Sequence, residues 1–290
     1  MQAKGAAPSS PLTSWFTSAA ESLFATLFPA DCRICGEPLI KISRLPVCAD
    51  CLAAIRPISG GTCVVCGERI FSPYAVSTNG PELLCGLCRR IEPPFVRATA
   101  YGSYEGGLRE LIHLLKYEQV RPAANVLGRM LAEAIDDLEP SFGDGPVHVV
   151  PVPLHHEKMR QREFNQSELI AAAALKVKAA NSRLVLNPSV VARRRPTQSQ
   201  IGLTRHQRRE NLRGAFVVVK PEQIGGCEVL LVDDVFTTGT TVSECARILR
   251  RAGASKIWVA TVARTLKKEE AKNAEASGGG EIHMPAAALA

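Results

Sequence analysis

Eight of the ten cysteines form four C-x-x-C pairs, and this arrangement constrains the fold of the 290-residue chain more than any other feature. The pairs are Cys32/Cys35, Cys48/Cys51, Cys63/Cys66 and Cys85/Cys88. A C-x-x-C turn directs two thiolates at one tetrahedral centre, and a second pair further along the chain completes a closed four-thiolate site. The spacing therefore predicts two structural zinc ions.

Two alternatives to this zinc assignment follow from the same cysteines. Disulfides are one, but they persist poorly in a reducing compartment, and we expect a cytoplasmic protein because no export signal is recognisable. The pairing is the other. The matching stretches "CRICGEP" and "CVVCGER" indicate a duplication of residues 32–51 and 63–88, which favours sequential sites. The spacing leaves open a crossed pairing, in which the first and third pairs share one metal.

The rest of the chain divides at changes in composition. Apolar residues between Trp15 and Phe28 recur at helical spacing, which favours an amphipathic helix over residues 12–28. Its polar face lacks the Lys and Arg of a membrane-surface helix, so it is expected to pack against its own chain rather than a membrane. No apolar run is long enough to span a bilayer. Pro93-Pro94 separates two domains, and a glycine triplet interrupts the C-terminal stretch. We expect an amphipathic leader at 1–30, a double zinc ribbon at 31–92, a second domain at 95–265 and a disordered tail at 266–290.

The second domain alternates strand-like and helical patterns. Strands are expected at 97–104, 147–153, 228–235 and 256–264, and helices around 108–116, 123–138, 166–180 and 240–251. Such alternation predicts an α/β fold with a mostly parallel sheet. Residues 95–265 contain 24 Lys and Arg against 17 Asp and Glu, which favours an anionic ligand.

The stretch "VLLVDDVFTTGTT" places polar groups at the carboxyl end of a buried strand, where ligands bind in open α/β sheets. The turn offers hydroxyls and helix N-terminal N–H groups suited to a phosphate, from Thr237, Thr238, Gly239, Thr240 and Thr241. No lysine follows the glycine, so this is no Walker A loop. Asp233 and Asp234 suit sugar hydroxyls with Mg²⁺ nearby. Phosphoribosyl pyrophosphate carries a 5-phosphate, ring hydroxyls and a metal-binding diphosphate.

This stretch resembles the phosphoribosyl-pyrophosphate signature of type I phosphoribosyltransferases. Together with the paired C-x-x-C ribbons, three more segments resemble the ComF family (competence protein F): "YGSYEGGLRELIHLLKYE", "VVPVPLHHEKMRQREFNQS" and "RRRPTQSQIGLTRHQRRENLRGAF". The resemblance extends from about Cys32 to Arg264. It implies a type I phosphoribosyltransferase-like domain, a mostly parallel sheet flanked by helices, behind a small double zinc ribbon. It also implies a role in DNA uptake during natural transformation.

The resemblance also implies roles for particular residues. The pyrophosphate loop would contain Pro153, Leu154, His155 and His156, and the hood over the site would span Tyr101 to Tyr117. Asp233 and Asp234 would hold the ribose, while Mg²⁺ and basic side chains would stabilise the departing pyrophosphate, the candidates being Lys116, Arg160, Arg162 and Arg193. His155 and His156 are either general bases or hydrogen-bonding anchors. One departure is visible, because Glu163 stands where the family usually has glycine.

The acceptor is not identified by these residues. Residues 193–213 contain seven arginines and one acid, Glu210, which is typical of a flexible basic loop that closes over a diphosphate or follows nucleic-acid phosphates. Two hypotheses remain. The chain is a phosphoribosyltransferase with an unidentified acceptor, or it is a transport accessory that binds single-stranded DNA, contacts DNA-uptake proteins and uses phosphoribosyl pyrophosphate as a ligand.

Overall fold

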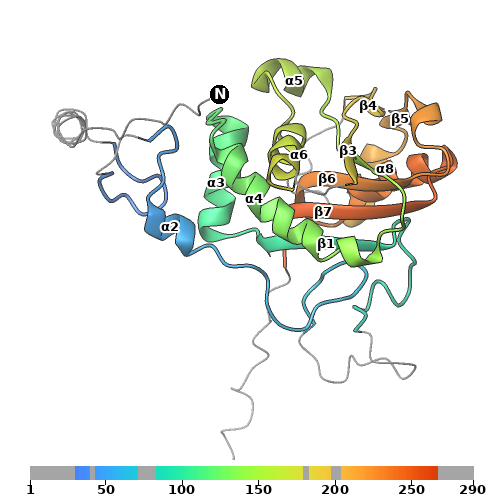
Figure 1. Ribbon diagram of the computed structural model, residues 1–290, viewed down its shortest axis with the longest axis horizontal. Coiled ribbons are helices and arrows are strands. Elements are labelled where there is room, and N and C mark those ends of the chain that lie inside the picture. Colours follow the sequence, from blue (N-terminus) through green and yellow to red (C-terminus); the bar gives the residue numbers. More distant parts are fainter. Residues whose placement is uncertain (1–29, 40–42, 71–82, 179–182, 197–203, 267–290) are drawn as a thin grey trace, which may run out of the picture.

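In the computed structural model, which describes residues 30–39, 43–70, 83–178, 183–196 and 204–266, five strands form one parallel sheet (Figure 1). The strands run in the order β1 (Arg97–Ser103), β7 (Lys256–Arg264), β6 (Glu228–Phe236), β2 (Val147–Pro151) and β3 (Leu184–Leu186). The four strands predicted from the sequence are confirmed, and β3 is an edge strand that the sequence analysis missed.

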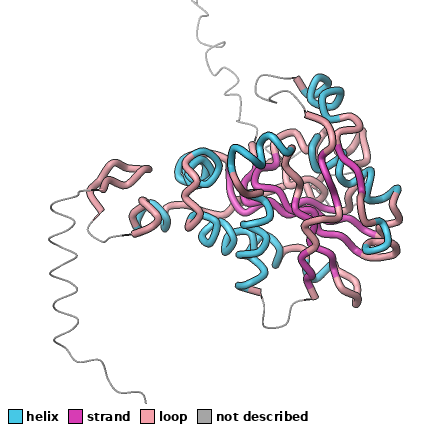
Figure 2. The backbone as a smooth tube through the Cα atoms, turned by 90° about the horizontal axis from the view of Figure 1, so that it is seen from above, coloured by secondary structure: helices cyan, strands magenta, loops and turns pink. Residues whose placement is uncertain are grey.

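Helices cover both faces of the twisted sheet (Figure 2). One face carries α3 (Gly106–Tyr117), α4 (Ala123–Asp136) and α6 (Gln166–Val177), and the other carries α8 (Thr240–Arg251). Leu230 and Val232 of β6 pack into the first layer, whereas Val229 and Leu231 pack against α8. Because successive side chains point to opposite faces, a strand buried on both must be continuously apolar. This explains the apolar run before Asp233.

The segment between β3 and β6 is more regular than its sequence suggests. It contains an antiparallel pair, β4 (Val191–Arg193) and β5 (Phe216–Val218), and the helix α7 (Arg205–Leu212). Thr204 and Gln207 form a capping box that fixes the start of α7. The expectation of a flexible basic loop over 193–213 is therefore wrong for 204–213, and residues 197–203 lie outside the described part.

Short elements complete the domain: α5 (His156–Arg162) and the 3₁₀ turns η2 (Glu139–Ser141) and η3 (Pro221–Gln223). The helix expected near residues 12–28 and the tail at 267–290 lie outside the described residues. Within the described part, no helix has both the length and the apolar character needed to cross a membrane.

The cysteine-rich region repeats one local structure twice. The amides of Cys32 and Cys63 donate to the carbonyls of Glu37 and Glu68, at 2.8 Å in both cases. The glycines after the second cysteines, Gly36 and Gly67, have φ of 78° and 69°. Positive φ is costly for residues with a Cβ, which explains why glycine recurs there. The duplication inferred from the sequence is thus confirmed, with the helix α2 (Ala49–Ala53) following Cys48.

Candidate functional site

The turn between β6 and α8 lies at the carboxyl edge of the sheet. Gly239 caps α8 with φ of 72°, and a Cβ at this position would lie 2.6 Å from the Phe236 ring. The position thus requires glycine for its conformation and for space. No side chain caps α8, and the first N–H groups of any helix lack partners within it. The turn is therefore able to receive an anion.

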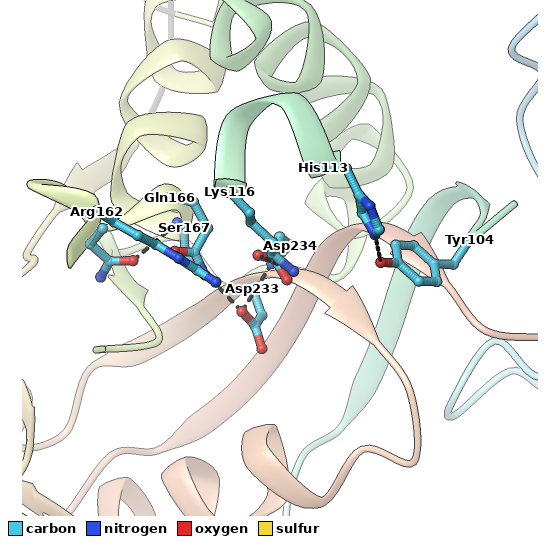
Figure 3. A network of polar contacts seen from close by, with 9 residues as sticks. Tyr104, His113, Lys116, Arg162, Gln166, Ser167, Asp233 and Asp234 are labelled. Atoms are coloured by element: carbon cyan, nitrogen blue, oxygen red, sulfur yellow. Dashed lines mark hydrogen bonds and ion pairs between the residues drawn. The ribbon is translucent and has the colours of Figure 1, made fainter. Parts of the chain in front are cut away.

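Two adjacent carboxylates precede this turn and have different partners (Figure 3). Asp234 is buried, and its Oδ2 lies 2.8 Å from Lys116 Nζ of α3. Asp233 Oδ1 accepts hydrogen bonds from Ser167 Oγ at 3.0 Å and from the Asp234 amide at 2.9 Å. Three elements, β6, α3 and α6, therefore meet at the two carboxylates.

The ionisation of this cluster is shifted. Burial, together with the neighbouring charge of Asp234, raises the pKa of Asp233 to about 7. Burial opposes the charge on Lys116, but Asp234 outweighs it and raises the pKa of the lysine. Such shifted groups concentrate at functional sites.

The carboxylates open into a cavity of about 480 Å³, the carboxylate cavity. Among the residues predicted from the sequence, it is lined by Lys116, Pro153, Leu154, Arg162, Arg193, Asp233, Asp234, Thr237 and Thr241. Burial and then the cations Arg193, Arg162 and Lys116 lower the pKa of Lys158, which also lines it. A cavity crowded with cations in this way suits an anion such as a diphosphate.

Other predicted residues lie outside this lining. Thr238 and Gly239 face a neighbouring cavity, and the Thr238 and Thr240 hydroxyls are 2.8 Å apart. The ring of the buried His155 lies against that of the exposed His156, with 4.0 Å between ring centroids and 51° between the ring planes. Its Nε2 has no hydrogen-bond partner within the described structure. Arg160 of α5 is exposed. Neither histidine nor Arg160 is among the residues that line the carboxylate cavity.

Several residues of this lining lie in segments that the sequence analysis placed at the site without giving them individual roles: Tyr104, Arg109, His113 and Tyr117 in the expected hood, and Arg208 in the basic segment. The sequence analysis missed Lys158 and Gln166. Arg109 and His113 are four residues apart on α3, and Lys116 and Tyr117 follow His113 by three and four residues, which places them on one helix face. This spacing was the available signal. Arg208 of α7 donates to Thr237 Oγ1 at 3.3 Å and so brings the basic segment to the phosphate turn.

The backbone conformation at Glu163 shows why the family usually has glycine at this position. It ends α5 in the left-handed conformation, with φ of 64°. A glycine adopts that conformation without steric cost. Glu163 Oε2 lies 3.6 Å from Arg121, in an exposed ion pair. The loop after α5 is then fixed by Asn165, which donates to the Val152 carbonyl and caps α6.

The eight paired cysteines gather into two clusters of four, Cys32/Cys35/Cys48/Cys51 and Cys63/Cys66/Cys85/Cys88. Within each cluster all four sulfurs lie within 4.8 Å of one another. A tetrahedral zinc with bonds of about 2.3 Å requires sulfurs about 3.8 Å apart. The distance between Cys35 Sγ and Cys48 Sγ is 3.8 Å, and that between Cys66 Sγ and Cys85 Sγ is 3.6 Å. The donors fit zinc, and the grouping is sequential, not crossed.

The environment of these sulfurs also suits a metal. Burial opposes thiolate formation at Cys32, but backbone N–H groups, that of Cys48 foremost, lower its pKa to about 6. The two remaining cysteines differ from this pattern. Burial raises the pKa of Cys245 on α8, whereas Cys227 is half-buried.

The second cluster forms one wall of a larger cavity of about 630 Å³, the ribbon cavity. Cys66, Cys85 and Cys88 line it together with Thr237, Thr238 and Gly239. Arg208 and Thr237 line both cavities. The phosphate turn therefore contributes residues to both the carboxylate cavity and the ribbon cavity.

Known proteins match both parts of the chain. The family described as double zinc ribbon domain matches residues 23–91, and that described as phosphoribosyl transferase domain matches residues 189–287. DNA utilization protein YhgH of Salmonella typhi is 32% identical, covering 82% of this chain and 98% of that protein. Competence protein F of Haemophilus influenzae is 32% identical, covering 75% and 96%. A hypoxanthine phosphoribosyltransferase structure from Staphylococcus aureus is 15% identical, covering 48% and 62%, with a TM-score of 0.31. The two matched domains and the full-length similarity to these relatives establish that the chain belongs to the ComF family.

Proposed function

We propose that the protein binds phosphoribosyl pyrophosphate with Mg²⁺ in the carboxylate cavity and transfers the phosphoribosyl group to an acceptor. One observation carries this proposal. Asp233 and Asp234 lie near the end of the central strand β6, the turn that leads to Gly239 and α8 follows Phe236, and the carboxylates and this turn both line a cavity rich in cations. The ligand combines ribose hydroxyls, a 5-phosphate and a diphosphate, and each of these groups suits one of the three features.

The ribose and the 5-phosphate are assigned to the β6–α8 junction. Asp233 and Asp234 accept hydrogen bonds from the ribose hydroxyls, and Thr237 to Thr241 surround the 5-phosphate. Ser167 holds Asp233 by its hydrogen bond of 3.0 Å, which orients that carboxylate. The oxygen atoms of both carboxylates also suit Mg²⁺, a hard cation that prefers oxygen ligands.

The diphosphate is assigned to the basic wall of the cavity. Lys158, Arg162 and Arg193 line it beside Pro153 and Leu154. They neutralise the charge that develops on departing pyrophosphate, and such fixed charges are effective in a site that excludes water. Lys116 pairs with Asp234 in this structure. When phosphoribosyl pyrophosphate binds, Lys116 either leaves Asp234 to contact the diphosphate or remains the counter-ion of Asp234.

Calorimetric titration with phosphoribosyl pyrophosphate, with and without Mg²⁺, tests the binding part. Gly239→Val should abolish binding, because the new side chain collides with Phe236 and fills the phosphate turn. Thr238→Ala should weaken binding only mildly, since the backbone donors remain. Equal affinity for both variants would contradict the assignment of the 5-phosphate to this turn.

Turnover is tested by pyrophosphate release with a panel of nucleobases, amines and single-stranded DNA. Release that depends on one acceptor class supports the transferase. Binding without release from any acceptor would favour the second candidate, a non-catalytic accessory of DNA uptake that binds single-stranded DNA and is regulated by phosphoribosyl pyrophosphate.

Two observations favour keeping this second candidate. Arg208, Arg209 and Arg247 line the ribbon cavity, and the relatives are named for competence and DNA utilization. Replacing both Arg208 and Arg209 by Ala should flatten the dependence of log affinity on log salt by about 0.7 for each DNA phosphate that these arginines neutralise. Arg129→Ala, at an exposed position on α4, is the matched control. An unchanged slope would contradict DNA binding at this cavity.

A further inference from the structure

The hood contains a hydrogen-bonded pair that the binding of phosphoribosyl pyrophosphate does not use (Figure 3). Tyr104 precedes α3 and His113 lies within it, with 3.0 Å between Tyr104 Oη and His113 Nε2. Both residues line the carboxylate cavity. The His113 ring also meets the Tyr117 ring edge-on, with 5.2 Å between centroids. The imidazole is therefore held in place on the cavity wall by two aromatic neighbours.

The charges around this pair keep the imidazole neutral. Burial, then Arg109, lowers the pKa of His113, and Lys116 acts in the same direction while Glu110 opposes it. A neutral imidazole has a lone pair with which to accept a proton.

The tyrosine hydroxyl lies within the electrostatic influence of the carboxylate cluster. Burial raises the pKa of Tyr104, and the charges of Lys116 and Asp234 both act on its hydroxyl. The hydroxyl therefore remains protonated at neutral pH, and Tyr104 lines the same cavity as the two carboxylates.

We propose, on the basis of the function proposed above, that Tyr104 and His113 form a proton relay that activates the acceptor. Tyr104 Oη takes a proton from an N–H or O–H group of the acceptor and passes its own proton to His113 Nε2. The deprotonated atom bonds to ribose C1, and the bond from C1 to the pyrophosphate oxygen breaks, with its electron pair leaving on pyrophosphate. Tyr104 is the catalytic residue that touches the acceptor, and His113 acts through it.

The cavity also indicates the class of acceptor. Six cationic side chains line it against two carboxylates, the cations being Arg109, Lys116, Lys158, Arg162, Arg193 and Arg208. A protonated amine would be repelled by this field, and it has no lone pair with which to attack ribose C1. The relay therefore takes an acceptor that is not a protonated amine and that carries an exchangeable proton. Among the described residues, His113 is the sole histidine that lines the cavity; His155 and His156 do not line it.

The test compares two nucleophiles in pyrophosphate release from phosphoribosyl pyrophosphate with Mg²⁺. Water must lose a proton as it attacks, whereas azide need not. Tyr104→Phe and His113→Gln should each slow the water reaction about 100-fold, within the range for general-base catalysis, and leave the azide reaction within about twofold. The affinity for phosphoribosyl pyrophosphate should be unchanged. His206→Gln, at an exposed position on α7, is the matched control and should alter neither reaction.

Loss of the water and azide reactions in parallel would overturn the relay, as would binding by the wild type without release to either nucleophile. Failure of the wild type to bind phosphoribosyl pyrophosphate would instead contradict the proposed function. Nitrogen-15 NMR of the protonation state of the His113 ring tests the relay independently of turnover. A neutral ring whose Nε2 accepts from Tyr104 at pH 7 is expected, and a doubly protonated ring would overturn it.

Discussion

The two cysteine clusters share ligand chemistry but differ in what surrounds them. In the first cluster Cys35 is exposed, and Ile34 and Ile55 pack near Gly107 at the start of α3. In the second, Cys63 and Cys66 are both buried. The first cluster is therefore a surface module beside the hood, whereas the second is embedded between the sheet and the ribbon cavity.

One arginine accounts for much of this difference. Arg264, at the end of β7, donates to the carbonyl of Cys66 and lies 3.1 Å from Glu68. Its guanidinium also lies 4.4 Å from the centroid of Phe236, the residue whose ring packs on Gly239. A continuous chain of contacts thus links the second cluster to the phosphate turn. Zinc in the second site should support ligand binding, and zinc in the first should not.

The largest expected effect comes from removing one ligand in each cluster. Cys66→Ser and Cys35→Ser should each reduce the bound zinc from two equivalents to one, because structural zinc supplies most of the folding free energy of a small ribbon. The two variants should then diverge. Cys66→Ser should weaken binding of phosphoribosyl pyrophosphate by about tenfold or more, the equivalent of about 1.4 kcal/mol.

Cys35→Ser should bind phosphoribosyl pyrophosphate like the wild type, since its cluster does not touch the phosphate turn. Metal analysis and calorimetry on the same samples check both statements. Equal loss of affinity for phosphoribosyl pyrophosphate in the two variants would show that the clusters do not differ in their link to the phosphate turn. A zinc content near zero in the folded, reduced wild type would contradict both zinc sites.

An effect on stability rather than on metal content is expected from the two arginines that attach the clusters. Arg264→Met removes the buried guanidinium that pairs with Glu68, and breaking a largely buried pair on one side costs about 3 to 5 kcal/mol of unfolding free energy. Arg33→Met breaks an exposed pair with Glu118 on the first cluster and should cost about 0 to 1 kcal/mol. Urea denaturation of the zinc-loaded protein measures both. Similar costs would show that the second cluster is no more firmly attached than the first.

The dependence on pH separates effects in the site from effects through the second cluster. The pKa of Asp233 is raised to about 7, so the carboxyl is neutral below that pH and accepts weaker hydrogen bonds from ribose. Affinity for phosphoribosyl pyrophosphate should therefore increase as the pH rises through 7, by up to about tenfold per unit on the acid side.

Asp233→Asn provides the control, because it should bind weakly and lose this component of the pH dependence. Cys66→Ser should retain it, because that variant acts on the turn and not on the carboxylate. Calorimetry between pH 6 and pH 8 decides the matter, and an identical profile for wild type and Asp233→Asn would refute the assignment.

The smallest effect is expected at a position outside both clusters. Glu163→Gly relieves a left-handed backbone conformation that costs other residues about 1 kcal/mol, and it removes only an exposed ion pair with Arg121. Thermal unfolding should shift upward by a few degrees without any change in bound zinc. A decrease in stability would mean that the Glu163 side chain contributes more than its exposed ion pair suggests.

The sequence predicted those features that depend on local periodicity. β7 and α8 have the predicted bounds, since their apolar patterns match one period throughout. The sulfur clusters were predicted by ligand spacing, and only the choice between sequential and crossed pairing required coordinates. The helix α7 was missed because its sequence is strongly polar, so its helical state depends on the Thr204 capping box and on burial of Leu212.

Features that depend on tertiary contacts were beyond the sequence. The contact between Lys116 and Asp234 gave no sequence signal, because it joins α3 to β6 and these elements are far apart in the chain. Arg264 gave no signal at all, because its partners Cys66 and Glu68 are almost 200 residues away in the chain. The relation between Tyr104 and His113 was hidden in the same way, although both lie in the segment expected to form the hood.

The central claim is that Asp233 and Asp234 hold the ribose of phosphoribosyl pyrophosphate. Calorimetric titration of the wild type with this ligand, in Mg²⁺ and without it, tests the claim most directly beside Asp233→Ala and Asp234→Ala. We expect Mg²⁺-dependent binding by the wild type and a loss of about one to two decades in affinity for each variant, because each removes charged hydrogen bonds of roughly 1.5 to 3 kcal/mol. No binding by the wild type at millimolar ligand, or equal binding by the variants, would contradict it.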